Sequence, residues 1–355
     1  MKQEYRVLGL MSGTSLDGLD IALCVFKYDD NVWQYLIEKA KTFDYSALWK
    51  DKLSSAENLS GVELMLLHNE YGELLGKYVL DFASMDIGNV DFISSHGHTV
   101  FHQPHKKLTL QIGNGASISA ITRKTVVCDF RTLDVALGGQ GAPLVPIGDM
   151  MLFKKYSYCL NLGGFANISF NNESGIRVAF DICPVNIVLN HLVKSINLEY
   201  DDKGNIGRQG RVNNDLLTKL NNLNFYIQKG PKSLGKEWVW NEVIPILEEN
   251  YEMPLEDKVC TFYHHTLQQI KNVVINDSEK EMLVTGGGAH NDFLIELFHQ
   301  NLSPKVIIPD SNIVNFKEAL VFAFLGVLRT RGEVNCLKAV TGAELDNIGG
   351  TIYTV

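Results

Sequence analysis

The sequence lacks an excess of positive charge, because its 32 Lys and Arg residues face 41 Asp and Glu residues and leave a net charge of −9. Nucleic-acid binding requires a basic face, so we expect no nucleic-acid partner. No run approaches the roughly 18 uninterrupted apolar residues of a membrane-spanning helix. The apolar start at residues 7–11 is too short for a signal peptide. These absences predict a cytoplasmic protein with no membrane partner.

The sequence also lacks the cysteine and histidine spacings of a metal or disulfide framework. None of the six cysteines forms a Cys-x-x-Cys pair, which favours reduced and mostly buried thiols. Four histidines fall within residues 96–105, but no nearby Cys or Glu completes a zinc spacing, and Pro104 argues against one helix that carries them all. We therefore expect no metal held directly there, and instead a histidine that orients a substrate.

The 355 residues, 45% of them hydrophobic, are enough for two or three domains. Strand and helix signals alternate along the chain, which predicts an α/β fold. Helical patterns dominate residues 186–276. The predicted strands cover residues 5–11, 19–27, 91–95, 108–112, 125–130, 158–162, 168–170, 175–180 and 281–285, and the other predicted helices cover 60–83, 116–123, 291–300 and 316–329.

Residues 7–15 and residues 160–168 resemble each other as a strand, a turn of small residues and the start of a second strand. The two segments lie about one domain length apart. One interpretation is two similar lobes that face a shared cleft. The other is a chance likeness between short glycine turns, and the residues alone leave both open.

The first of these turns, within residues 9–20, combines glycines, hydroxyls and carboxylates. Its backbone N–H groups could hold phosphate oxygens, and Asp17 or Asp20 could reach a magnesium ion directly or through water. The alternative is a tight hairpin whose side chains cap their own backbone.

Two further segments allow a functional and a purely structural interpretation. Residues 284–291 form a strand, three glycines and a helix start, where a nucleotide could lie against the backbone or where strand and helix simply pack closely. Asp181 ends a predicted strand, where a carboxylate could act as a general base or could cap the next helix.

With these segments in this order, the chain resembles the anhydro-N-acetylmuramic acid kinases of the actin, sugar kinase and Hsp70-like ATPase superfamily. The resemblance covers nearly the whole length. It is carried by residues 9–20, 95–99, 130–134, 138–144, 161–168, 180–181, 231–233, 285–291 and 340–343.

The resemblance implies a two-lobed ribonuclease H-like (actin-like ATPase) fold with an interlobe cleft. We expect residues 1–130 with about 336–355 in the first lobe and residues 131–335 in the second. The implied activity uses ATP, Mg²⁺ and water to open 1,6-anhydro-N-acetylmuramic acid and to phosphorylate O6. The product would be N-acetylmuramic acid 6-phosphate, a step in peptidoglycan recycling. The family also implies a homodimer.

The resemblance also implies the site residues. Asp181 would be the catalytic base that activates water, and Arg131 would bind the acidic lactyl group of the sugar, for which a guanidinium suits. Mg²⁺ would be held through water from Asp17 or Asp20. The other substrate contacts would be His98, Asn186 and Glu318, and the ATP contacts would be Gly13, Thr14, Ser15, Leu16, Asp17, Gly18, Leu19, Asp20, Gly163, Gly164, Asn167, Gly286, Gly287 and Gly288.

One segment departs from the family. The usual run Asp-Thr-Gly-Pro-Gly-Asn is here Asp181-Ile182-Cys183-Pro184-Val185-Asn186. The loss of a hydroxyl and two glycines beside the base could alter the sugar pocket or slow catalysis. The alternatives to the predicted kinase are therefore a kinase of another sugar with the same fold, and a catalytically silent sensor that binds ATP and a muropeptide.

Overall fold

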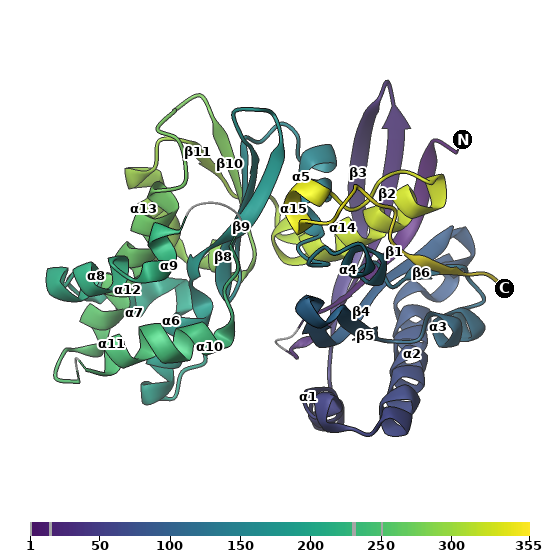
Figure 1. The fold of residues 1–355 in the computed structure, drawn as a ribbon, viewed down its shortest axis with the longest axis horizontal. Coiled ribbons are helices and arrows are strands. Elements are labelled where there is room, and N and C mark those ends of the chain that lie inside the picture. The colour runs from purple at the N-terminus through teal and green to yellow at the C-terminus, as the bar shows by residue number, and fades with distance from the viewer. Residues whose placement is uncertain (1, 14–15, 229–231, 250) are drawn as a thin grey trace. The chain divides into compact units, whose positions relative to one another are not determined.

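The computed structural model describes residues 2–13, 16–228, 232–249 and 251–355. These residues form two compact units, Met1–Leu152 with Phe316–Val355 and Phe153–Asn315 (Figure 1). The structure thus assigns residues 131–152 and 316–335 to the first unit, whereas the sequence placed them in the second. The physical reason is close packing. A Cβ on Gly148 would lie 2.6 Å from the side chain of Val321, so these two segments are pressed against each other.

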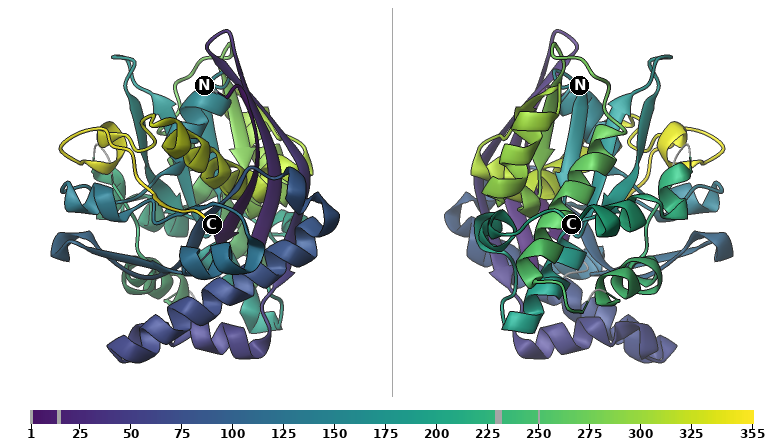
Figure 2. Two further views of the ribbon diagram at one scale, coloured as in Figure 1. Left: turned by 90° about the vertical axis from the view of Figure 1, so that its right-hand side faces the viewer. Right: turned by 90° about the vertical axis from the view of Figure 1, so that its left-hand side faces the viewer.

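The first unit contains a seven-stranded sheet in the order β12-β6-β4-β1-β2-β3, with β5 paired to β4. Strands β1, β2 and β3 run antiparallel as long neighbours (Figure 2), while β1, β4 and β6 are parallel. The C-terminal strand β12 closes the edge beside β6. The strands are β1 (Glu4–Ser12), β2 (Gly18–Asp29), β3 (Val32–Asp44), β4 (Phe92–Gln103), β5 (Leu108–Ile112), β6 (Val126–Cys128) and β12 (Thr351–Tyr353).

Alternation along β1 sends its side chains to opposite faces of this sheet. Leu8 and Leu10 join the core that includes Tyr71 and Leu75 of α2 (Gly61–Ala83). Gly9 faces the other side, where an added Cβ would lie 2.1 Å from the carbonyl oxygen of Ala319 in α14 (Ser311–Arg331). Only a glycine allows this helix to approach the strand so closely. The other helices of the unit are α1 (Ala47–Ser54), α3 (Gly115–Thr122), α4 (Thr132–Ala136), α5 (Val145–Leu152) and α15 (Lys338–Thr341).

Helix α14 continues across the boundary between the two units, and its backbone is non-helical at Phe316, with φ −118° and ψ 15°. Among the described residues, this is the one helix long and apolar enough to cross a membrane by length and composition. Its apolar residues do not form one uninterrupted run, because Lys317 and Glu318 lie within it. Of its apolar window, 72% is buried inside the protein, which is the environment of a core helix.

The second unit contains a five-stranded sheet in the order β11-β10-β7-β8-β9. Three antiparallel strands (β7, β8, β9) are followed by two strands parallel to β7, which repeats the core order of the first unit. This repeated order is the ribonuclease H-like topology that the sequence predicted. The strands are β7 (Tyr158–Leu162), β8 (Phe165–Asn171), β9 (Arg177–Pro184), β10 (Glu281–Thr285) and β11 (Lys305–Ile307). The helices are α6 (Asn186–Val193), α7 (Asn205–Gln209), α8 (Asn214–Asn221), α9 (Asn224–Ile227), α10 (Lys236–Trp238), α11 (Ile244–Glu248), α12 (Leu255–Lys271) and α13 (Asp292–Asn301).

Several strands differ from the sequence prediction, among them β11 and β12, which it did not include. Strand β4 does not end at residue 95, because its second half pairs with β5 from His98 onward. Strand β9 does not end at Asp181, because Cys183 and Pro184 still pair with β8. Strand β3 was missed, because many of its side chains are polar and exposed.

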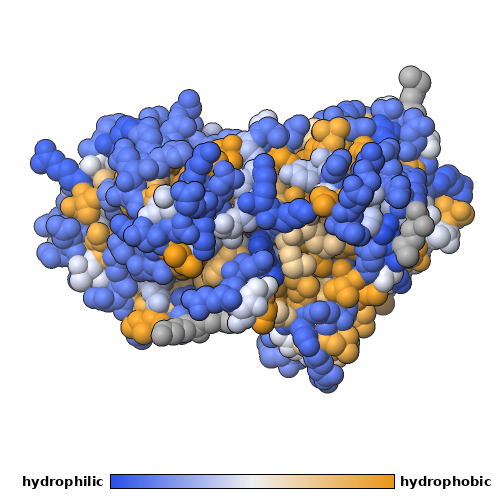
Figure 3. All heavy atoms as spheres, turned by 90° about the horizontal axis from the view of Figure 1, so that it is seen from above, coloured by the Kyte–Doolittle hydropathy of each residue, from blue (hydrophilic) through white to orange (hydrophobic). Residues whose placement is uncertain are grey.

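In the face shown in Figure 3, hydrophilic residues predominate and apolar ones form separate groups.

Candidate active site

The predicted phosphate-binding turn joins β1 to β2. Thr14 and Ser15 lie outside the described residues. Leu16 adopts a left-handed backbone with φ 61°, and its side chain packs against the core of the first unit. Leu19 is buried in that core, and a Cβ on Gly18 would lie 2.6 Å from a carbonyl oxygen of β3. The side chains of Leu16 and Leu19 are therefore used for packing, and Gly18 and Leu19 pair with β3 in the sheet.

His98, a predicted substrate contact, is buried beneath this turn. Its Nδ1 lies 3.1 Å from the hydroxyl of Ser12, which accepts a hydrogen bond from the hydroxyl of Tyr45 at 2.8 Å. Tyr45 also contacts the hydroxyl of Tyr71. Desolvation lowers the pKa of His98 to about 4, so the ring is neutral near pH 7. His98 thus belongs to a buried hydrogen-bond network with Ser12 and Tyr45, next to the start of the turn.

Three carboxylates lie on the first unit near the turn. Asp20 accepts a hydrogen bond from Thr42 at 2.6 Å, and its pKa is raised first by desolvation and further by the charge of Asp17. Desolvation also raises the pKa of Glu318, to which the charge of Asp20 contributes. Among the described residues no group of three or more His, Cys, Asp or Glu side chains could hold a metal ion directly. Mutually repelling carboxylates with only oxygen donors nevertheless fit a hydrated Mg²⁺.

Arg131 is held entirely by uncharged acceptors. Its Nε and one terminal nitrogen lie 3.1 and 2.9 Å from Nε2 of His96, and the other terminal nitrogen donates to the carbonyl of Gly141 at 2.6 Å. Desolvation lowers the pKa of Arg131 to about 10, opposed by the charge of Glu318, so the group remains cationic at neutral pH. No carboxylate in the described part of the chain forms an ion pair with it. A desolvated cation without a counterion is suited to an anionic ligand.

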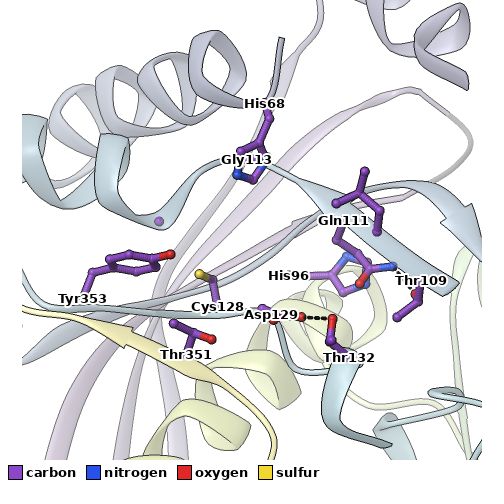
Figure 4. Close-up of a pocket in the computed structure, with 12 residues that line it drawn as sticks. His68, His96, Thr109, Gln111, Gly113, Cys128, Asp129, Thr132, Thr351 and Tyr353 are labelled. Carbon is purple, nitrogen blue, oxygen red and sulfur yellow. Dashed lines mark hydrogen bonds between the residues drawn. The ribbon is translucent and has the colours of Figure 1, made fainter. Parts of the chain in front are cut away.

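A cavity of about 200 Å³ lies in the same unit, and His96 forms part of its wall (Figure 4). His68 accepts from the N–H of Gly113 at 3.1 Å, which leaves its other ring nitrogen as a donor. Neither Lys nor Arg is among the described lining residues. Hydroxyl, amide and imidazole groups, together with the carboxylate of Asp129, therefore suit a polar ligand without negative charge. The polar lining residues are His68, His96, Thr109, Gln111, Asp129, Thr132, Thr351 and Tyr353.

Of these cavity residues, the sequence had indicated only His96, as a member of the histidine cluster at residues 96–105. They come from α2, β4, β5, β6, α4 and β12, which are far apart in the chain. Asp129 has φ 58° and accepts a hydrogen bond from Thr132, and desolvation raises its pKa. The one usable signal was the segment of residues 130–134, which the family resemblance already included.

Asp181, the predicted base, lies in the second unit opposite the exposed Asn167 in the β8–β9 ladder. Its carboxylate accepts a hydrogen bond from the N–H of Leu234 at 2.9 Å, and its own N–H donates to the carbonyl of Lys232 at 2.9 Å. Desolvation raises the pKa of Asp181, and the bond from Leu234 partly opposes that shift. A partly buried carboxylate with a raised pKa suits proton abstraction.

The residues that depart from the family pattern after Asp181 are buried. Ile182, Cys183 and Val185 are at most 2% exposed and belong to the hydrophobic core of the second unit. Burial raises the pKa of the Cys183 thiol, so this thiol is not activated. The departure therefore changes the packing beneath the base, and the described geometry of Asp181 does not depend on a hydroxyl or glycine at these positions.

Two glycine turns flank this base in the second unit. Gly163 and Gly164 join β7 to β8, and the carbonyl of Gly164 accepts from the N–H groups of Val185 and Ile187 at 2.8 and 3.3 Å. The turn is thereby tied to the start of α6. Asn186, at the first position of that helix, donates weakly to the carbonyl of Leu162 at 3.4 Å.

The second turn follows β10. Gly286 has φ 83°, and a Cβ there would lie 2.8 Å from Oδ1 of Asn161. A Cβ on Gly288 would lie 2.7 Å from the side chain of Leu162. Only Gly287 faces open space, with its nearest neighbour 3.9 Å away at Asn186. Gly286 and Gly288 are thus required by packing, whereas packing does not require a glycine at position 287.

Two α/β units with repeated ribonuclease H-like sheets, a glycine turn on each and a partly buried carboxylate are typical of phosphotransferases of the sugar-kinase class. The family model of anhydro-N-acetylmuramic acid kinase matches residues 5–355. The chain is 32% identical over 380 residues to a protein of that name from Pseudomonas savastanoi, with 99% of each chain covered. It is 33% identical over 375 residues to the protein of that name from Vibrio cholerae, again with 99% of each covered.

The chain belongs to the anhydro-N-acetylmuramic acid kinase family, and it is a kinase that uses ATP. These matches support that activity over a kinase of another sugar and over a silent sensor. Among solved structures, the chain is also similar to the activator of 2-hydroxyisocaproyl-CoA dehydratase from Clostridium difficile, with 13% identity and a TM-score of 0.46 over 93% of this chain and 98% of that one.

Proposed function

We propose that the protein opens 1,6-anhydro-N-acetylmuramic acid with water while O6 receives the γ-phosphoryl group of ATP, which yields N-acetylmuramic acid 6-phosphate and ADP. Asp181 takes a proton from the water that attacks C1, and the C1–O6 bond breaks. The observation that carries this assignment is the carboxylate of Asp181, partly desolvated and fixed by the N–H of Leu234. The step fits a role in peptidoglycan recycling in the cytoplasm.

The anhydro bridge explains why one base serves both events. O6 has no free hydroxyl in this substrate, so it can accept a phosphoryl group only as its bond to C1 breaks. Asp181 supplies the negative charge that makes the attacking water nucleophilic. Phosphoryl transfer itself needs mainly positioning and charge neutralisation. Backbone groups of the turn from Gly13 to Asp20 would hold the phosphates, and the Gly163–Gly164 turn with Asn167 and the Gly286–Gly288 turn would hold the rest of the nucleotide.

Arg131 would bind the lactyl carboxylate of the sugar, because it is a desolvated cation whose described acceptors are all neutral. The cavity lined by His96 would receive uncharged hydroxyl or acetamido groups of the same sugar, since its described lining contains no Lys or Arg. His98, Asn186 and Glu318 remain proposed substrate contacts. We also propose a homodimer, and a hydrated Mg²⁺ near Asp17 and Asp20 that would neutralise phosphate charge.

The direct test is ADP release by the purified protein with ATP and Mg²⁺, measured with the anhydro sugar and with a panel of other sugars. We expect release only with the anhydro sugar, together with a phosphorylated muramic acid product. Gln111→Leu should raise the KM for the sugar by about tenfold, in line with the loss of one or two hydrogen bonds. Thr351→Val, a milder change in the same cavity, is the control. Stimulation by a different sugar would reject the proposed substrate, and no release with any sugar would reject the proposed reaction.

A further inference from the structure

The orientation of Arg131 is fixed by the neutral form of His96. The His96 ring is 6% exposed, and its Nδ1 lies 3.0 Å from the carbonyl oxygen of Gly97. A carbonyl can only accept, so Nδ1 carries the proton and Nε2 presents a lone pair. That lone pair is the acceptor for two nitrogens of Arg131. Proton uptake at Nε2 would place two cations against each other, and the pKa of His96 is accordingly far below its usual value, first through desolvation and then through Arg131.

A buried carboxylate fixes the other side of the guanidinium. Asp134 is fully buried, and its Oδ2 accepts from the N–H of Gly141 at 2.7 Å. Its Oδ1 accepts from Thr341 and Asn347, each at 2.8 Å. The carbonyl of Gly141 is in turn the acceptor for Arg131. Asp134 therefore links the C-terminal segment to the acceptor that holds one end of the guanidinium.

The two contacts leave part of the guanidinium available. The five N–H donors of an arginine form a fixed planar fork, of which these partners occupy the Nε donor and one donor on each terminal nitrogen. The ring of His96 is itself fixed by packing against Phe322, with ring centroids 4.5 Å apart. A planar fork held at two points can present its remaining donors in one direction only.

We propose that His96 and Asp134 are positioning residues that aim Arg131 at the carboxylate of the sugar, and that they thereby determine the preference for an acidic sugar over its neutral analogue. The inference rests on the proposed function, which assigns the carboxylate to Arg131. Neither residue is the group that binds the carboxylate. They act by holding the guanidinium in a geometry that a carboxylate can match with two parallel hydrogen bonds.

The test compares two substrates, the anhydro sugar with its free lactyl carboxylate and the methyl ester of that carboxylate. His96→Leu removes the acceptor at Nε2 and should raise the KM for the acid at least tenfold more than it raises the KM for the ester. His96→Gln retains an oxygen near the position of Nε2 and should restore most of the preference. His96→Met gives the same prediction as His96→Leu with a more adaptable side chain, in case the leucine disturbs folding.

Arg131→Met separates this inference from the proposed function. If Arg131 binds the carboxylate, this variant loses the preference for the acid, and the double variant His96→Leu/Arg131→Met is no worse than Arg131→Met alone. An additive double variant, or a His96→Leu variant that raises the KM for acid and ester equally, would overturn the positioning role. An Arg131→Met variant that keeps the preference would instead reject the proposed carboxylate site. Asp134→Asn should reproduce the loss of preference, with folding checked by its melting temperature.

Discussion

The carboxylate of Asp181 and the main chain of Leu234 form a hydrogen bond of 2.9 Å, although the two residues lie 53 positions apart in the sequence. The segment of Leu234 also accepts from the Asp181 main chain, through the carbonyl of Lys232. One carboxylate oxygen is thereby committed to a main-chain donor. No described residue donates to the other oxygen, which can take the proton of a water.

Replacement of Asp181 tests its role as the base. Asp181→Asn keeps the size of the side chain and an oxygen that can accept from Leu234, so we expect the fold to persist. The amide cannot take a proton, and kcat should fall by about 10² to 10⁴, the usual contribution of a general base. In steady-state kinetics, the KM of this variant for ATP should stay close to that of the wild type. Turnover equal to the wild type would rule out this role.

The pH dependence of activity follows from the raised pKa of Asp181. Only the deprotonated carboxylate acts as a base, so kcat/KM should fall as pH falls through that pKa, at a pH above the ordinary value of 3.8. The N–H of Leu234 lowers the pKa by favouring the charged form. Leu234→Pro removes that N–H and should move the acid limb of the profile to higher pH. Leu234→Ala keeps the N–H and is the control, and equal shifts in both variants would contradict the argument.

The glycine turn after β10 predicts a selective effect on ATP. A Cβ at Gly287 meets nothing closer than 3.9 Å, so Gly287→Ala should leave the free energy of unfolding within about 0.5 kcal/mol of the wild type. If the nucleotide lies against this backbone, the added methyl group should raise the KM for ATP severalfold. Gly61→Ala, at another open position, should change neither quantity. An unchanged KM for ATP in Gly287→Ala would show that the nucleotide does not lie against this turn.

A buried ion pair near the kink of α14 predicts a stability effect. Nζ of Lys317 lies 2.7 Å from Oδ1 of Asp149 in α5, and both side chains are 5% exposed. Lys317→Met leaves a buried negative charge without this partner and should lower the free energy of unfolding by about 3–5 kcal/mol. The double variant Lys317→Met/Asp149→Leu should recover much of that loss. Denaturant unfolding would measure both, and a double variant as unstable as the sum of its single changes would argue against a direct pair.

Local patterns were sufficient for much of the fold. The strands at residues 108–112, 158–162 and 281–285 match the structure to the residue, because each is a short apolar run bounded by turn signals. The polar strand β3 could not be recognised in this way, since its pairing with β2 rather than its own side chains stabilises it. The boundary between the two units also differs from the predicted one, because no local sequence pattern indicates that α14 packs on β1 at Gly9.

The sequence by itself determined the family, the repeated α/β topology and the identity of the proposed base, because each depends on residue types in a fixed order. Only the tertiary structure decided what surrounds those residues. It placed Ile182, Cys183 and Val185 in the core beneath Asp181, and it brought His96 and the carbonyl of Gly141 onto Arg131. These contacts join segments from separate strands and loops, and no local pattern encodes such distances. The pKa values of Asp181 and Arg131 depend on that burial, so they too are properties of the fold rather than of the sequence.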